Sequence, residues 1–195
     1  VKVGLTIEQI ILNEGLRPLA EEKKLKILTP LEFVKDLETV LQNKTLAAYS
    51  MAEYNTIKQV LISAQLEIPK IRYCNMRTVT KKYIKSNSRL KKKFEALPPF
   101  LKKTNTYQQK RMRWSLASVS RLFPVRIPSD YHPGQTSQRF KFAVKAIQNK
   151  NGEYSKISGT AKSKATKALK HNLFDVEVLP IIFTTILEDN PNLIS

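Results

Sequence analysis

Apolar residues recur at every third or fourth position along most of the chain, and this spacing is typical of helices with one buried face. Residues 30–41 give the clearest case: Thr29 can cap the helix, Pro30 suits its first position and Glu32 can close a capping box. Strict alternation of β-branched residues is nearly absent, so the predicted fold class is mainly α. Further helices are expected over residues 6–15, 51–65, 105–123, 136–152 and 160–170.

The segment from residue 76 to residue 97 combines a narrow apolar face with a broad cationic face. At about 100° per residue, six apolar side chains fall within a sector of about 60°: Met76, Val79, Tyr83, Leu90, Phe94 and Leu97. The same projection places six basic side chains in an opposing sector of about 120°: Lys81, Lys82, Lys85, Arg89, Lys92 and Lys93. We predict one continuous amphipathic helix whose back is wholly cationic.

Prolines divide the rest of the chain. Pro98 and Pro99 end the cationic helix, and residues 124–135 predict a loop that connects two lobes. The last apolar stretch, residues 174–187, contains Pro180, which predicts a strand-like piece before it and a helix after it. The inward faces of the helices over 105–123 and 136–152 are expected to consist of Met112, Leu116, Val119 and Phe123, and of Phe140, Ala143, Val144 and Ile147.

Charge is distributed unevenly along the chain, which carries 34 basic and 16 acidic residues and a formal net charge of +18. Residues 1–67 hold eight basic and nine acidic residues, whereas residues 70–126 hold seventeen basic residues and one acid, Glu95. Residues 171–195 hold four acids and no base. We therefore expect three parts: a near-neutral N-terminal lobe or arm (1–69), a basic helical core (70–126) and a C-terminal lobe with a tail (127–195).

Residues that carry common catalytic chemistry are scarce. His132 and His171 are the only histidines, and we interpret neither as having an acidic or histidine partner at a useful spacing. Cys74 is the only cysteine and is expected to pack as a small apolar side chain. Glycine-rich phosphate loops are absent, and Glu95 alone cannot form a two-metal site. We predict a protein that is not an enzyme and that uses no cofactor or metal.

So large a cationic excess attracts anionic partners, and nucleic acid suits helical rows of Lys and Arg because phosphates need no sequence-reading motif. Trp114 and Phe142 fall off the apolar faces of their helices, so each can stack on a base or pack between lobes. The predicted RNA-binding residues are Arg77, Lys81, Lys82, Lys85, Arg89, Lys92, Lys93, Lys110, Arg111, Arg113, Trp114 and Arg121.

Three short stretches resemble a known family: "IRYCNMRTVTKKYIKSNSRL" (71–90), "RWSLASVSRLFP" (113–124) and "ALKHNLFDVEVLP" (168–180). They are similar to segments of the nucleoproteins of segmented negative-strand RNA viruses of the phlebovirus and tenuivirus type. The resemblance implies an all-α, two-lobed fold that holds single-stranded RNA in a basic cleft and docks an N-terminal arm on the next subunit. This chain departs from the family in being shorter and in placing Arg121 after the valine of the motif.

The sequence-based hypothesis is a compact, two-lobed helical nucleoprotein with a basic groove, which encapsidates single-stranded RNA with little dependence on sequence. Its expected partners are RNA, further copies of itself joined through apolar terminal arms, and a viral polymerase. It is expected in the host cytoplasm and in the virion, and not in a membrane, because the longest apolar run, residues 179–187, is too short to span a bilayer. Alternatives are a ribosomal type of RNA-bound subunit, a coat protein of a filamentous virus and a membrane-surface adaptor, and both apolar ends can equally cover their own core.

Overall fold

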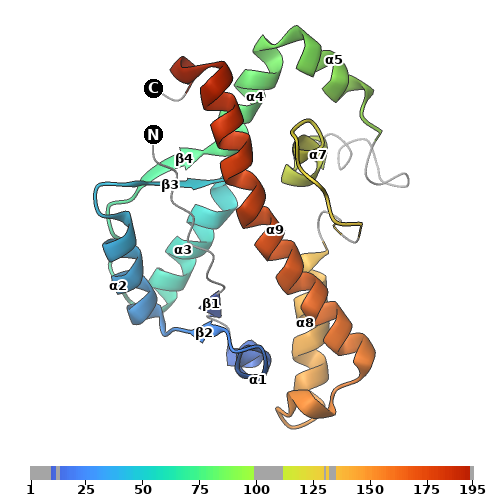
Figure 1. Ribbon diagram of the computed structural model, residues 1–195. Helices are drawn as coiled ribbons and strands as arrows, with labels where there is room; N and C mark the ends of the chain where they lie inside the picture. Colours follow the sequence, from blue (N-terminus) through green and yellow to red (C-terminus); the bar gives the residue numbers. More distant parts are fainter. Residues whose placement is uncertain (1–9, 12–13, 99–111, 130, 132–134, 194–195) are drawn as a thin grey trace.

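Helices dominate the computed structural model, which describes residues 10–11, 14–98, 112–129, 131 and 135–193 (Figure 1). The prediction of a mainly α fold is confirmed. The α-helices of the described ranges are α1 (Arg17–Glu22), α2 (Pro30–Leu41), α3 (Met51–Ser63), α4 (Met76–Ser86), α5 (Ser88–Ala96), α7 (Leu116–Ser120), α8 (Thr136–Gln148) and α9 (Gly159–Asp189). Short 3-10 helices are η1 (Glu14–Leu16), η2 (Tyr154–Lys156) and η3 (Pro191–Leu193).

Two small parallel strand pairs accompany the helices. β1 (Ile10–Ile11) pairs with β2 (Lys26–Ile27), and β3 (Thr45–Ala48) pairs with β4 (Arg72–Asn75), so that Thr45 lies opposite Arg72. The helix predicted over residues 6–15 is therefore wrong at Ile10 and Ile11, because pairing with β2 favours the extended backbone there. Residues 6–9 and 12–13 of that prediction lie outside the described residues.

The expected capping of α2 is confirmed. The Thr29 hydroxyl accepts a hydrogen bond from the Glu32 N–H at 3.3 Å, and the Glu32 carboxylate accepts one from the Thr29 N–H at 2.7 Å. The second of these bonds is the main reason why the pKa of Glu32 lies below its usual value. α3 begins with the same capping box, made by Ser50 and Glu53. These reciprocal bonds satisfy backbone donors that would otherwise lack partners at a helix start.

α9 corrects two predictions at once, because it is a single helix of 31 residues that runs through Pro180. The predicted helix over 160–170 and the apolar stretch over 174–187 are joined, and the strand-like piece before Pro180 is wrong. Proline inside a helix removes one backbone hydrogen bond. Burial of Val178, Ile182 and Ile186, each fully buried, offsets this cost because they form one stripe at a spacing of four residues.

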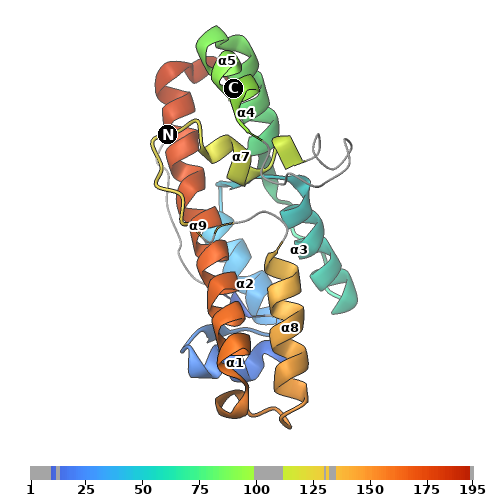
Figure 2. The same cartoon turned by 90° about the vertical axis from the view of Figure 1, so that its right-hand side faces the viewer.

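Two hydrophobic clusters lie along α9, one near each end (Figures 1 and 2). The first, here called the α4 cluster, joins α4, α5 and α7 to the C-terminal half of α9; it consists of Tyr49, Met76, Tyr83, Ile84, Phe94, Leu116, Ala117, Val119, Phe123, Tyr131, Phe174, Val178, Ile182 and Ile186. The second, here called the α8 cluster, joins η1, α1, α8 and η2 to the N-terminal half; it consists of Leu16, Leu19, Ala20, Ala143, Ile147, Tyr154, Ile157, Ala161, Ala165 and Leu169. The division at residues 69 and 126 stays a prediction.

The apolar C-terminal stretch is packed on its own subunit and is not a free arm. Ile182 and Ile186 are fully buried in the α4 cluster, and Leu179 and Phe183 pack against it. The expectation of a C-terminal arm is wrong because the buried stripe of α9 continues to its last turns. Of the apolar N-terminal segment expected to act as an arm, residues 3–12, only Ile10 and Ile11 are described, and they pair with β2 of the same chain. Within the described ranges, no helix is both long enough and apolar enough to cross a bilayer.

Candidate nucleic-acid interface

The cationic segment begins where β4 leads directly into α4. The Asn75 side chain caps the helix by accepting a hydrogen bond from the Thr78 N–H at 3.3 Å. The Arg77 N–H donates to the carbonyl of Tyr49 at 2.9 Å, just after β3. Both contacts fix the first turn of α4 to the β3–β4 pair, and this pair therefore sets the direction in which the helix leaves the core.

The prediction of one continuous helix over residues 76–97 is wrong, because the chain bends at Asn87. This residue has an extended backbone, with φ of −102° and ψ of 105°, and it ends α4 and begins α5. Its N–H donates to the Tyr83 carbonyl at 3.2 Å, and its side chain accepts from the Leu90 N–H at 3.0 Å. Figure 1 shows α5 turning away from the direction of α4, so the two cationic faces do not form one straight strip.

The apolar face predicted for this segment is confirmed in spite of the bend. Met76, Tyr83 and Phe94 are buried in the α4 cluster, and Val79, Leu90 and Leu97 pack against it. The Tyr83 hydroxyl also donates to the Asp189 carboxylate at the end of α9. Asn87 restarts the helix so that each half presents its own apolar side to the same cluster.

Most of the predicted basic side chains of α4 and α5 face solvent. Lys82, Lys85, Arg89, Lys92 and Lys93 are exposed, whereas Arg77 and Lys81 are half-buried. Lys91, which the helical projection left out, is exposed as well. Within the part of the chain that the structure describes, none of the lysines of α4 and α5 forms an ion pair with a carboxylate. This surface therefore carries uncompensated positive charge, which an anionic ligand can neutralise.

Trp114 lies beside α4 and α5. The Lys81 ammonium lies 5.4 Å from the Trp114 ring centroid, and the Phe94 ring centroid lies 4.2 Å from that of Trp114. The pKa of Lys81 is lowered, first by burial and then by the charges of Arg77 and Lys85. These three cations occupy successive turns of α4, so they share one side of the helix. Trp114 is half-buried against Phe94. Of the two roles that the sequence left open for this ring, packing and base stacking, the structure shows the packing.

Two of the predicted RNA-binding arginines bind the backbone at the end of α5. The Arg113 guanidinium donates to the carbonyls of Phe94 and Glu95, at 3.1 Å and 2.9 Å. The Arg121 guanidinium donates to the carbonyl of Pro98 at 2.9 Å. Cations at a helix C-terminus satisfy its free carbonyls and interact favourably with its dipole. Both arginines therefore hold α5 against the segment around α7, and contacts to RNA stay a prediction for them.

The last two predicted RNA-binding residues are not placed on the surface of α4 and α5. Lys110 and Arg111 lie outside the described residues. The helix predicted over 105–123 is described from residue 112 onward, where Ser115 interrupts it by capping α7, accepting from the Ser118 N–H at 3.2 Å. Among the inward residues predicted there, Leu116, Val119 and Phe123 are buried as expected.

A buried polar cluster around His171 was not predicted from the sequence. The His171 imidazole lies 3.5 Å from the Asp175 carboxylate, one helical turn later on α9, and stacks on the Tyr131 ring at 4.2 Å. The Tyr131 hydroxyl donates to Asp175. The expectation that His171 lacks an acidic partner is thus wrong, and the i, i+4 spacing of His and Asp was the overlooked signal.

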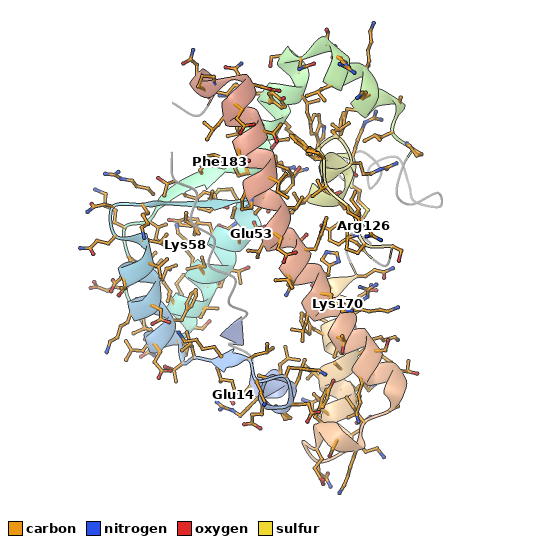
Figure 3. The ribbon with its side chains drawn as sticks, in the orientation of Figure 1. Glu14, Glu53, Lys58, Arg126, Lys170 and Phe183 are labelled. Atoms are coloured by element: carbon orange, nitrogen blue, oxygen red, sulfur yellow. The ribbon has the colours of Figure 1, made fainter. Side chains whose placement is uncertain are left out.

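Burial raises the pKa of Asp175 to about 6, and the charge of Glu53 on α3 adds to this rise, while the Tyr131 hydrogen bond opposes it. Glu53 lies in the first turn of α3 (Figure 3). The cluster ties the 124–135 segment to α9, since Tyr131 is buried in the α4 cluster. The described residues hold no group of three His, Cys, Asp or Glu side chains suited to a metal ion.

No protein-family model, curated protein or solved structure matches this chain.

Proposed function

We propose that the protein is a non-enzymatic nucleoprotein that binds single-stranded RNA along the exposed cations of α4 and α5. The observation that carries this proposal is the row of exposed side chains on these two helices, without carboxylate partners among the described residues: Lys82, Lys85, Arg89, Lys91, Lys92 and Lys93. Phosphates neutralise such charges and release counterions.

The same chemistry supports binding that depends little on base sequence. Lysine ammonium groups contact phosphates as point charges and carry no information about bases. The half-buried Trp114 ring beside Lys81 offers one aromatic edge for a base near this cationic row. Single-stranded RNA is favoured over duplex because the bend at Asn87 turns the cations along a curved path that a flexible strand can follow.

We also propose that copies of the protein associate through the N-terminal segment. The C-terminal stretch is not part of this contact, because it is buried in its own subunit. The resemblance to viral nucleoproteins supports encapsidation of a genome by many copies. Purified protein that carries RNA, seen as excess absorbance at 260 nm, and that forms rings or filaments in negative stain would support it. A protein that stays monomeric on single-stranded RNA but binds folded RNA would favour the ribosomal type of subunit.

The test is the affinity for a fluorescently labelled oligouridylate, measured by anisotropy over a range of salt concentrations. If the seven cations from Lys81 to Lys93 each contact a phosphate, log affinity falls with log salt at a slope of about −5, at about 0.7 for each single-strand phosphate. A slope near zero would exclude phosphate binding on this surface. Binding to anionic vesicles without binding to oligouridylate would replace the proposal with the membrane adaptor.

A further inference from the structure

The helix α8 lies along the first half of α9, at the end away from α5 (Figure 2), and these two segments carry a second set of basic side chains. Residues 135–170 contain nine basic residues and a single acid, Glu153, which pairs with Lys156 at 2.8 Å. Lys156 is the only lysine here that pairs with a described carboxylate; those that form no such ion pair are Lys141, Lys145, Lys150, Lys162, Lys164, Lys167 and Lys170. This charge is as little compensated as that of α4 and α5.

An aromatic ring lies on this surface. Phe142 is 43% exposed although its neighbours Ala143 and Ile147 are buried, because it projects from the outer side of α8. The Lys164 ammonium of α9 lies 3.6 Å from the Phe142 ring centroid. A single exposed phenylalanine is ordinary on a protein surface. An exposed phenylalanine whose ring contacts a lysine ammonium group, with further lysines nearby that form no ion pair, has the composition of a stacking platform for single-stranded nucleic acid.

Another side of α8 is hollowed. A cavity of about 460 Å³ lies beside α8 and is lined by two of its lysines together with apolar side chains; the lining consists of Leu16, Phe140, Lys141, Val144, Lys145, Gln148 and Asn149. Lysine ammonium groups beside an apolar wall can contact a phosphate while the wall packs against the face of a base. The helix α8 thus carries cations, an exposed ring and a concave wall.

We propose that the Phe142–Lys164 surface is a second contact for the same RNA strand that α4 and α5 hold. This inference rests on the proposed function. Lys164 and Ile182, which belongs to the α4 cluster, are separated by about 27 Å along α9 at 1.5 Å per residue. A short oligonucleotide fits one surface, whereas a longer one can reach both, and the second contact then forms at a high effective concentration.

The single tryptophan provides a direct reporter. In a Trp114→Phe, Phe142→Trp variant, the only indole lies on α8, and a base that stacks there quenches its fluorescence. Oligouridylates of about 4 to about 20 nucleotides bracket the usual site sizes of single-strand binders. We expect quenching that grows with length. We also expect Phe142→Ala to lose about 5- to 150-fold of the affinity for the longest strand, the range of one stacked base.

Ile62→Ala is the matched control, because Ile62 is 56% exposed on α3 and lies on neither cationic surface. Unchanged fluorescence of the relocated tryptophan, together with wild-type affinity of Phe142→Ala, would overturn the second contact while leaving binding at α4 and α5 intact. Failure of the wild type to bind any oligouridylate would instead overturn the proposed function. A fluorescence change with anionic phospholipid vesicles but not with oligouridylate would also overturn the inference, in favour of a membrane ligand.

Discussion

Replacing Lys82, Lys85 and Lys92 by glutamine removes three exposed cations from α4 and α5 without touching the core. All three side chains face solvent, and none forms an ion pair within the described part of the chain. Glutamine keeps most of the side-chain length and a good helix propensity. We therefore expect the free energy of unfolding to change little and the affinity for single-stranded RNA to fall.

The magnitude follows from the number of phosphates lost. At about 0.7 per phosphate, the slope of log affinity against log salt should change from about −5 in the wild type to about −3 in the triple variant. Between about 50 and about 200 mM salt, the wild type would then lose affinity about 1,000-fold and the variant about 50-fold. Anisotropy of a labelled oligouridylate measures both curves.

A triple variant with the same loss of charge provides the control. Lys23, Lys35 and Lys44 are exposed in the N-terminal part of the chain, and their replacement by glutamine lowers the net charge equally. If RNA responds only to overall charge, the two variants will have the same slope. Equal slopes would refute the assignment of α4 and α5 as the interface, whereas a wild-type slope for the control supports it.

Three further predictions concern the fold. Ile186→Ala should lower the free energy of unfolding in urea by about 2 to 5 kcal/mol, since Ile186 is fully buried; Val176→Ala, on the exposed side of α9, should cost less than about 0.5 kcal/mol. Folding raises the pKa of Asp175 to about 6, so the folded protein binds a proton at this carboxylate more tightly than the unfolded chain does. As the pH falls from about 7 to about 5, the Tm of the wild type should therefore rise relative to the Tm of Asp175→Asn. A difference in Tm that stays constant over this range would contradict the raised pKa. Burial raises the pKa of the Cys74 thiol, so iodoacetamide should modify the folded protein more slowly than the urea-unfolded protein, and equal rates would show an accessible thiol.

Local signals in the sequence predicted the parts of the fold that depend on neighbouring residues. The capping box of Thr29 and Glu32 and the inward face of α8 need only a few adjacent positions, and both are confirmed. The β3–β4 pair joins segments separated by the whole of α3, so no local pattern could indicate it. Pro180 is a strong local signal that packing overrides, because the buried stripe of α9 extends on both sides of it.

In the candidate interface, too, local sequence signals predicted some features and tertiary packing decided others. The exposure of Lys82, Lys85 and Lys92 follows from helical periodicity, which survives the bend at Asn87. The bend itself was readable in the sequence Ser86-Asn87-Ser88, which is rich in capping residues, but the apolar pattern across it suggested continuity. Burial of one face of Trp114 by Phe94 depends on how α5 meets the α7 segment, and a helical projection carries no such information.

The central claim, that RNA lies along α4 and α5, is tested most directly by ultraviolet cross-linking of bound oligouridylate followed by mass spectrometry of the digested protein. We expect cross-linked peptides from residues 76–96 and from the peptide that contains Trp114. Peptides from residues 136–170 should join them as the oligouridylate is lengthened. Cross-links confined to residues 14–63, where basic and acidic side chains are balanced, would contradict the proposed RNA contacts of α4 and α5.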